Sequence, residues 1–388
     1  MDGLKPDELA QLDGLDRGLL HVFVAGPGVG EGLAIALPGA GWVLVDGCRA
    51  GGDLPLREIL SRWRAADESV EAYVFTHPHA DHADGIAELV EATAPLRICV
   101  AGATRPERHV FQLARDAAKG DSADADEFGS FALAREVLNA LQAMRTWEED
   151  LQRKVDAWYD GCSLQIGAVQ ILVRAPSGGE VRAFMRRGGA VERLRKRAND
   201  LSLVVEVRFG RCRVVLGGDL PRLRGNAKVA SGWDAVMRRH GHLGTHSGFK
   251  VPHHGSREAL HPKMNTARGQ DERAWLVTPY NASHLPRFDP EEGAQALLAS
   301  EPRLLVTAMP ASRATAGGRL PASGVIRRSQ IVARSTVQPT GNPFVDGGRD
   351  VRPAKRMRPL DAVWCVAFDQ TGALRGLWRG REAFVLEE

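Results

Sequence analysis

Cysteine is scarce in this sequence, and the few cysteines show no pairing. Five are scattered along the 388 residues, none forms a CxxC pair, and their number is odd. This pattern suggests neither a disulfide framework nor a thiolate zinc site. It fits a reducing compartment best, so we expect a cytoplasmic protein.

Long hydrophobic runs are missing as well. The longest apolar stretches, such as residues 201–207, have the length of a strand. A membrane helix needs roughly 20 apolar residues. The first residues are acidic and show no basic flank followed by an apolar run, which argues against a secretory signal. We therefore expect no membrane partner.

Neither sign of charge is in marked excess. The 51 lysines and arginines stand against 48 aspartates and glutamates, and 44% of the residues are hydrophobic. This is the composition of a folded chain, and its net charge neither demands nor excludes a nucleic-acid partner. Two segments are locally basic, residues 182–197 and 313–358. A basic segment can be a solvated surface or a contact for a polyanion.

Strand and helix patterns alternate along most of the chain. Short apolar runs bounded by glycine and proline predict strands, and amphipathic stretches predict helices. The expected strands are 20–25, 33–37, 42–45, 72–75, 96–101, 169–173, 201–207, 213–216, 249–251, 274–278, 304–307, 363–368 and 373–385. The expected helices are 54–64, 85–91, 233–239 and 290–300. The alternation predicts an α/β fold with parallel or mixed sheets.

Three segments interrupt this alternation. A helical insertion is expected at about 105–160, and a basic helical insertion at about 180–199. Residues 310–359 are rich in arginine, proline and glycine, which is typical of a linker. We therefore expect a domain of residues 1–309, followed by a basic linker and a C-terminal β extension at 310–388.

The segment after the expected strand 72–75 carries four potential metal ligands within six residues. It reads Thr-His-Pro-His-Ala-Asp-His, and the ligands are His77, His79, Asp81 and His82. Imidazole nitrogen and carboxylate oxygen are the usual ligands of catalytic zinc and of manganese or iron. The loop therefore predicts a metal site at the end of this strand.

This HxHxDH loop resembles the defining loop of the metallo-β-lactamase fold hydrolases. The resemblance implies a four-layered αββα sandwich. It also implies that His77 and His79 bind a first metal ion and that Asp81 and His82 face a second. The implied cofactor is a pair of divalent ions, Zn²⁺ or Mn²⁺.

Two further motifs match the same family. Asp46 ends the expected strand 42–45 and, by the resemblance, orients the metal loop through hydrogen bonds. Asp219 follows two glycines after the expected strand 213–216 and, by the resemblance, bridges the two metal ions.

Residues 250–256, Lys-Val-Pro-His-His-Gly-Ser, narrow the resemblance. Together with Asn-Asp-Leu-Ser at 199–202, they are similar to the hydrolase domain of ComEC-type competence proteins and of the related phosphorylcholine esterases. One or both of His253 and His254 would supply the late metal ligand.

Other side chains near these motifs are candidates for substrate contact and proton transfer. Lys250 and Ser256 could contact an anionic phosphate, although a lysine beside an apolar strand can equally be structural. Asn281 and His284 lie in a segment that resembles the family's closing region, which reaches the active site. Either His284 or His253 could act as general acid.

The chain departs from the family at two points. ComEC-type domains commonly have an aspartate at the second loop position, where this chain has His79, a residue more favourable to zinc. His109 is the only histidine between residues 96 and 219, and it lies in the expected helical insertion. The first metal ion is therefore left without a middle histidine ligand.

The remaining histidines have a simpler interpretation. His21 and His261, and the loose group of His240, His242 and His246, are expected to be structural or loop residues. The glycine-rich segment at 26–30 lacks the lysine of a phosphate-binding loop and predicts a β-turn.

Taken together, the motifs predict a metal-dependent hydrolase. Asp219 would hold two cations that activate a water, and Asp81 would accept a proton from it. The motif at 250–256 and the basic segments favour a phosphodiesterase or nuclease acting on DNA or RNA. The alternative is hydrolysis of a small ester, lactone or nucleotide. A third hypothesis makes the chain the hydrolase subunit of a multi-protein defence assembly that docks through residues 310–388.

Overall fold

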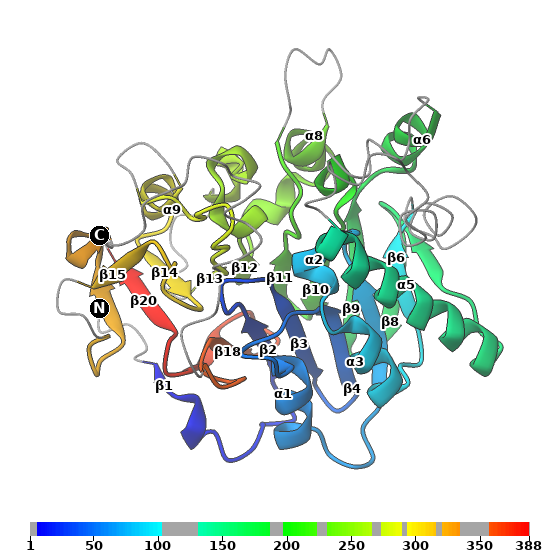
Figure 1. Cartoon of the computed structure of the whole chain (residues 1–388), viewed down its shortest axis with the longest axis horizontal. Coiled ribbons are helices and arrows are strands. Elements are labelled where there is room, and N and C mark those ends of the chain that lie inside the picture. Colours follow the sequence, from blue (N-terminus) through cyan, green and yellow to red (C-terminus); the bar gives the residue numbers. More distant parts are fainter. Residues whose placement is uncertain are drawn as a thin grey trace.

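The computed structural model describes most of the chain (Figure 1). The described residues are 6–102, 131–186, 197–222, 231–265, 273–288, 293–315, 320–333 and 357–387. His109, most of the basic segment 182–197 and part of the segment 313–358 lie outside the described residues. The expectations for those positions stay predictions.

The first sheet has nine strands and combines both ends of the chain. Its order is β1-β19-β18-β2-β3-β4-β5-β6-β7. The strands from β4 to β7 are parallel, and those from β19 to β4 are antiparallel. Their bounds are β1 Asp7–Glu8, β2 Leu20–Ala25, β3 Gly32–Leu37, β4 Gly41–Asp46, β5 Val70–Phe75, β6 Ile98–Ala101, β7 Asp156–Trp158, β18 Val363–Phe368 and β19 Leu374–Arg379.

The second sheet also has nine strands, in the order β16-β20-β14-β13-β12-β11-β10-β9-β8. The strands from β11 to β14 are parallel. Their bounds are β8 Ser163–Ile166, β9 Val169–Ala175, β10 Val204–Phe209, β11 Cys212–Leu216, β12 Gly248–Lys250, β13 Ala274–Val277, β14 Arg303–Val306, β16 Val325–Arg327 and β20 Phe384–Glu387. A separate ribbon pairs β15 Arg313–Thr315 with β17 Ile331–Ala333.

The helices occupy the outer faces of the two sheets. The α-helices are α1 Pro55–Trp63, α2 Ala80–Ala83, α3 Ile86–Thr93, α5 Phe131–Leu151, α6 Gly178–Arg186, α8 Gly232–Arg239 and α9 Ala294–Ser300. Short 3₁₀ turns are η1 Leu9–Gln11, η3 Ala198–Leu201, η4 Gly241–Gly244, η5 His253–Gly255, η6 Arg257–Ala259, η7 Pro262–Asn265 and η8 Arg328–Gln330. Over the described ranges, none of these helices has both the length and the apolar character needed to cross a membrane.

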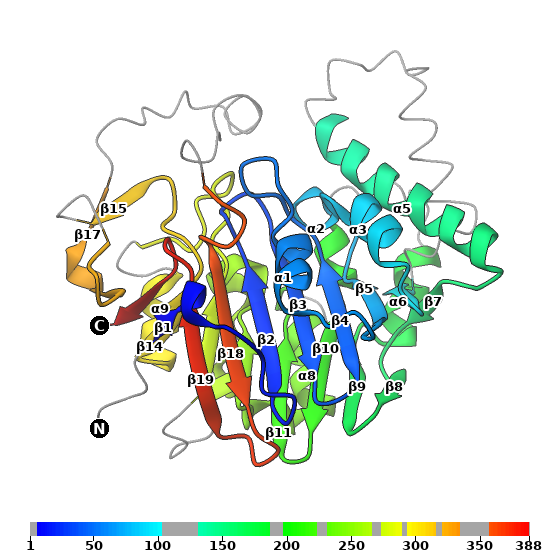
Figure 2. The same ribbon diagram turned by 90° about the horizontal axis from the view of Figure 1, so that it is seen from below.

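Three groups of buried side chains separate four layers. Strand β2 shows how: Val22 faces the core between the two sheets, and Phe23 faces the helices on the first sheet. Successive residues of a strand point to opposite faces, so a strand covered on both sides is hydrophobic throughout. A third core, which includes Trp233 and Phe249, lies between the second sheet and its helices. Figure 2 shows α1 and α3 on the outer face of the first sheet. The expected αββα sandwich is confirmed.

Parallel strands of both sheets end at one edge of the sandwich. Strand β4 ends at Asp46 and β5 ends just before Thr76. In the second sheet, β11 ends shortly before Asp219, and β12 ends shortly before His254. Residues that follow parallel strands gather at the carboxyl edge of a sheet, which is where α/β folds place their sites. The predicted metal motifs therefore meet at this edge.

One expected helix contains a strand. Within the expected insertion 105–160, α5 is helical, but Asp156–Trp158 is β7 and pairs in parallel with β6. The expectation of helix at these three residues is wrong. Apolar residues recur at near-helical intervals up to Trp158, so the spacing did not distinguish a short edge strand from the end of a helix.

The C-terminal strands lie inside both sheets. Strand β18 pairs with β2 and β19, and β20 pairs with β14 and β16. The expected strand 373–385 is two strands, since the chain crosses from one sheet to the other between Arg379 and Phe384. Strand β16 lies within the expected linker. The division at residue 309 stays a prediction, but these strands complete sheets formed by earlier residues.

Candidate metal centre

The metal loop is anchored on two sides. It follows the buried strand β5, and its residues His77, Asp81 and His82 are buried. The backbone nitrogen of Glu31 donates to the backbone oxygen of Asp81 at 2.9 Å. A Cβ on Gly30 would lie 2.4 Å from that oxygen, so this close approach requires glycine. The loop before β3 thus fixes the position of the metal loop.

Asp46, the last residue of β4, accepts three hydrogen bonds from this loop. One comes from the backbone nitrogen of Thr76 at 2.7 Å, one from Thr76 Oγ1 at 2.6 Å and one from His82 Nδ1 at 2.7 Å. Because Nδ1 of His82 carries the hydrogen, its Nε2 keeps a free lone pair. Thr76 Oγ1 also lies 3.0 Å from His77 Nδ1 and can accept from it, which leaves Nε2 of His77 free as well. Asp46 therefore sits where the orienting role requires.

The late histidine that enters the cluster is His254. Its Nδ1 donates to the backbone oxygen of Thr278 at 3.0 Å. Its Nε2 then faces Asp81 Oδ2 at 3.0 Å and Asp219 Oδ2 at 3.5 Å. The ring centroid of His253 lies 6.4 Å from that of His254, and its buried Nδ1 has no hydrogen-bond partner. Of the two histidines, His254 has the ligand geometry.

Several buried polar atoms at this point lack a hydrogen-bond partner. They are His77 Nε2, His79 Nδ1, Asp81 Oδ1, His82 Nε2 and Asp219 Oδ1. Buried polar atoms normally find partners, so a group of unpaired ones that face each other calls for an explanation. Asp219 lies 3.4 Å from Nε2 of His82 and 4.0 Å from Nε2 of His77, a spacing that fits ligands around a shared cation.

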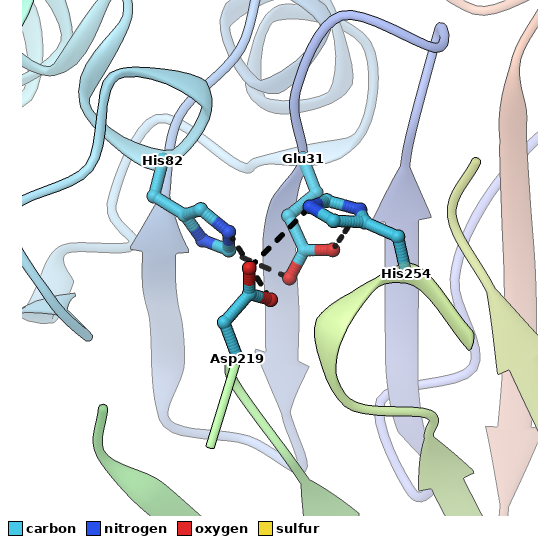
Figure 3. A group of neighbouring side chains, drawn as sticks. All are labelled: Glu31, His82, Asp219 and His254. Carbon is cyan, nitrogen blue, oxygen red and sulfur yellow. Dashed lines mark ion pairs between the residues drawn. The ribbon is translucent and has the colours of Figure 1, made fainter. Parts of the chain in front are cut away.

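Two groups of possible ligands share Asp219. The first, drawn in Figure 3, consists of Glu31, His82, Asp219 and His254. The second consists of His77, His79 and Asp219. Within each group the offered ligand atoms all lie within 4.8 Å of one another. Asp81 lies beside both groups, 3.1 Å from His79 Nδ1 and 3.9 Å from His82 Nε2. One carboxylate shared by two groups is the arrangement that two adjacent cations need.

The donor set fits divalent cations. All the atoms are imidazole nitrogens or carboxylate oxygens, which suit Zn²⁺ and Mn²⁺. Outer hydrogen bonds to Asp46 and Thr278 fix the orientation of the imidazoles, as they do around most protein-bound metals. No middle histidine joins the second group among the described residues, and His109 lies outside them.

Electrostatics at the centre favours positive charge. Burial lowers the pKa of His77 well below its usual range, so its ring stays neutral and able to bind a cation. Burial alone would raise the pKa of Asp219, but the rings of His254 and His82 hold it well below its usual value. Burial opposes charge on His82 too, yet Asp219 and Asp46 raise its pKa well above normal. Carboxylates that stabilise a proton on the ring of His82 would also stabilise a divalent cation, which would displace that proton.

Four of the predicted site residues are not members of the two ligand groups. Lys250, expected to contact a phosphate, is 1% exposed and forms an ion pair with Glu31. Asn281 accepts from the backbone nitrogen of Ala311 at 2.8 Å and so joins two loops. His284 is exposed, and in the described part of the chain its ring contacts none of the ligands. Ser256 is half-buried and hydrogen-bonds through its backbone. Lys250 and Asn281 thus have partners within the chain, and their contacts with a substrate stay predictions.

Several residues around the ligands were not predicted from the sequence. Glu31 lies alone between two glycines and gave no signal. Ser202 Oγ accepts from the backbone nitrogen of Asp219 at 2.9 Å and lies 3.2 Å from His77 Nδ1. Ser202 belongs to the motif at 199–202, which did signal the region without a role for the serine. The ring of Tyr280 stacks on His254 at 5.0 Å.

The remaining histidines are held by partners outside the centre. His240 pairs with Asp160 at 2.8 Å, and His242 lies 3.4 Å from Glu206. His246 is buried and its Nδ1 donates to the backbone oxygen of Leu243 at 3.0 Å. Over the described ranges these three histidines form no group of metal ligands.

Comparisons with known proteins agree with the ligand pattern. Residues 27–137, which include the metal loop, match the family model described as the metallo-beta-lactamase superfamily. A search of curated proteins found no match to this sequence.

Solved structures share a partial likeness with the chain. MIM-2 metallo-β-lactamase is 15% identical over 64% of this chain and 80% of its own, with a TM-score of 0.33. A B3 metallo-β-lactamase described as the first with an active-site glutamic acid is 20% identical over 61% and 74%, with a TM-score of 0.32. BJP-1, a B3 metallo-β-lactamase of Bradyrhizobium japonicum, is 15% identical over 56% and 69%, with a TM-score of 0.29. None of these likenesses identifies a substrate.

Proposed function

We propose that this chain, which contains a metallo-β-lactamase superfamily domain, is a metal-dependent phosphodiesterase that cleaves DNA or RNA. The observation that carries the proposal is the sharing of Asp219 by two groups of ligands. Phosphodiester cleavage needs charge stabilisation on both the attacking and the leaving oxygen, and two adjacent cations supply it.

The ligands divide between two cation positions. His77, His79 and Asp219 would hold one cation, and Asp219 with Asp81, His82 and His254 would hold the other. Two bound cations, Zn²⁺ or Mn²⁺, would lower the pKa of a water towards neutrality and stabilise the charge of a displacement.

The protein's own residues orient the ligands and move protons. Asp46 keeps Nε2 of His82 directed at the cluster. Asp81, whose buried Oδ1 lies 3.1 Å from His79 Nδ1, would accept a proton from the nucleophile. His253, with its buried and unpaired Nδ1, is the candidate that we favour for protonating the leaving oxygen over the exposed His284.

A nucleic-acid substrate is the finer part of the proposal. It is supported by the resemblance of residues 250–256 to ComEC-type hydrolase domains and by the basic stretches at 182–197 and 313–358. Those stretches hold few aromatic residues, so contacts would be to the phosphate backbone and would weaken with salt.

Cleavage of labelled nucleic acid tests the proposal. Purified protein loaded with Mn²⁺ or Zn²⁺ is incubated with single-stranded and double-stranded DNA and with RNA. We expect cleavage by the parent. We expect the cleavage rate to fall about 10³-fold or more in Asp219→Ala, because the variant would lose the carboxylate shared by the two cations that stabilise the transition state. Asp369→Ala, which changes a carboxylate in the turn between β18 and β19, serves as the matched control and should cut normally.

The outcome separates two substrate classes. A metal-loaded protein that leaves every nucleic acid intact, yet hydrolyses small esters or lactones, would replace the phosphodiesterase proposal by the small-molecule alternative. Equal cleavage by the parent and by Asp219→Ala would show that the activity comes from a contaminant.

A further inference from the structure

A buried ion pair lies against the metal centre. Lys250, the last residue of β12, and Glu31, just before β3, are each 1% exposed and form an ion pair. Leu216 and Leu276, which are in register with Lys250, face the core between the sheets, so Lys250 points the same way. A lysine and a glutamate buried in a hydrocarbon layer are costly to desolvate, which makes a role beyond packing worth seeking.

Glu31 contacts the ligand histidines on the side away from the cations. Its carboxylate lies 3.5 Å from Nδ1 of His254 and 3.8 Å from Nδ1 of His82. Both Nδ1 atoms already donate elsewhere, to Thr278 and to Asp46. The free Nε2 atoms face Asp81 and Asp219 instead. Although Glu31 lies close enough to count among the possible ligands, it approaches the wrong nitrogen of each ring.

Thr278 connects the ion pair to His254. Its Oγ1 donates to Glu31, and its backbone oxygen accepts from Nδ1 of His254. The backbone nitrogen of Glu31 also holds Asp81 through the carbonyl oxygen of that residue. Glu31 therefore touches both sides of the second cation position, at the metal loop and at the late histidine.

We propose that the Glu31–Lys250 pair is a positioning element of the second cation position, with Glu31 outside the ligand set. The inference rests on the proposed two-cation centre. The carboxylate fixes Thr278 and, through it, the ring of His254, while the ammonium offsets a carboxylate that would otherwise compete for the cation. Four buried carboxylates surround the centre and balance the charge of two divalent cations. The ammonium of Lys250 then leaves the loaded site with a net charge of one positive unit, which favours an anionic substrate.

Single and double variants separate positioning from ligation. Metal affinity is measured by competition with a chromophoric chelator, without substrate, on chains whose fold is verified by circular dichroism. Glu31→Gln leaves the buried ammonium of Lys250 without its carboxylate partner, and we expect the second cation to bind about 10- to 100-fold more weakly. The double variant Glu31→Gln, Lys250→Met removes both charges and should return the affinity to within about threefold of the parent.

Three results would overturn the proposal. If the double variant stays as weak as Glu31→Gln, the carboxylate itself is required whatever the charge of residue 250, and the role assigned to the pair is wrong. If neither variant changes the affinity for the metal, the ion pair has only a packing role. Glu206→Gln breaks a buried ion pair with Arg174 outside the centre. If it lowers the affinity for the metal as much as Glu31→Gln does, the effect is general destabilisation. Absence of nucleic-acid cleavage by a metal-loaded parent would contradict the substrate class alone and leave this inference standing.

Discussion

At the scale of single residues, the ligands that stand together in the sequence were predictable. His77, His79, Asp81 and His82 form one loop, and the chemistry of their side chains is sufficient to name a metal site. Glu31 gave no such signal, because it meets its partners Lys250 and Thr278 only when two sheets close on each other. A residue whose role depends on distant neighbours leaves no local pattern.

Asp46 shows how an outer hydrogen bond sets a ligand. In Asp46→Asn, one carboxylate oxygen becomes an NH₂ group that faces either the backbone N–H of Thr76 or the Nδ1–H of His82, so the metal loop loses a hydrogen bond at one of these donors. We expect the affinity for Zn²⁺ to fall about 10- to 100-fold. Chelator competition on the folded variant measures this change.

Asp84→Asn is the matched control for that prediction. Asp84 ends the same loop, but its carboxylate pairs with Arg49 at 3.0 Å and faces away from the ligands. Its variant should bind Zn²⁺ as the parent does. Unchanged affinity in Asp46→Asn would mean that the orienting role is wrong.

At the scale of elements, strands buried on both faces were easier to predict than edge strands. Strand β2 was expected at its observed bounds because all its residues but His21 are hydrophobic. The edge strand β8 was not expected, since only half of its residues are apolar and its burial is partial. Strand β16, three residues long, takes its place from pairing with β20, which lies about 60 residues further along the chain.

Strand β10 carries a buried carboxylate on the second sheet. Glu206 is fully buried and accepts hydrogen bonds from Arg174, Arg208 and Arg213. Burial would raise the pKa of Glu206, but the three guanidinium groups lower it from 4.5 to about 2. The ionised carboxylate therefore stabilises the folded chain.

The stability provided by Glu206 should depend on pH. Its folded pKa lies below its unfolded value, so its contribution is complete above pH 4.5 and is lost as the pH falls towards 2. We expect the free energy of unfolding of the parent to exceed that of Glu206→Gln by about 2–3 kcal/mol near pH 6. Near pH 2 the two should be nearly equal. Denaturant titrations in the presence of chelator measure both values, and a difference that does not vary with pH would refute the assignment.

At the scale of the whole molecule, the sequence predicted the layers but not how the chain closes them. The alternation of elements predicted an α/β fold, and the resemblance of the metal loop implied the αββα order. The insertion of β18 between β19 and β2, with β20 in the opposite sheet, depends on pairings that span most of the chain. Residues 310–388 had looked like an addition to the hydrolase because their partners lie so far away.

The central claim is that one carboxylate, Asp219, joins two cation positions. The most direct test is the metal content of the parent and of Asp219→Ala after loading with Zn²⁺ and dialysis, measured by inductively coupled plasma mass spectrometry. We predict about two ions per chain in the parent and fewer than about 0.5 in the folded variant, because both ligand groups lose a member. A parent that retains no metal, or a variant that retains as much as the parent, would contradict the account.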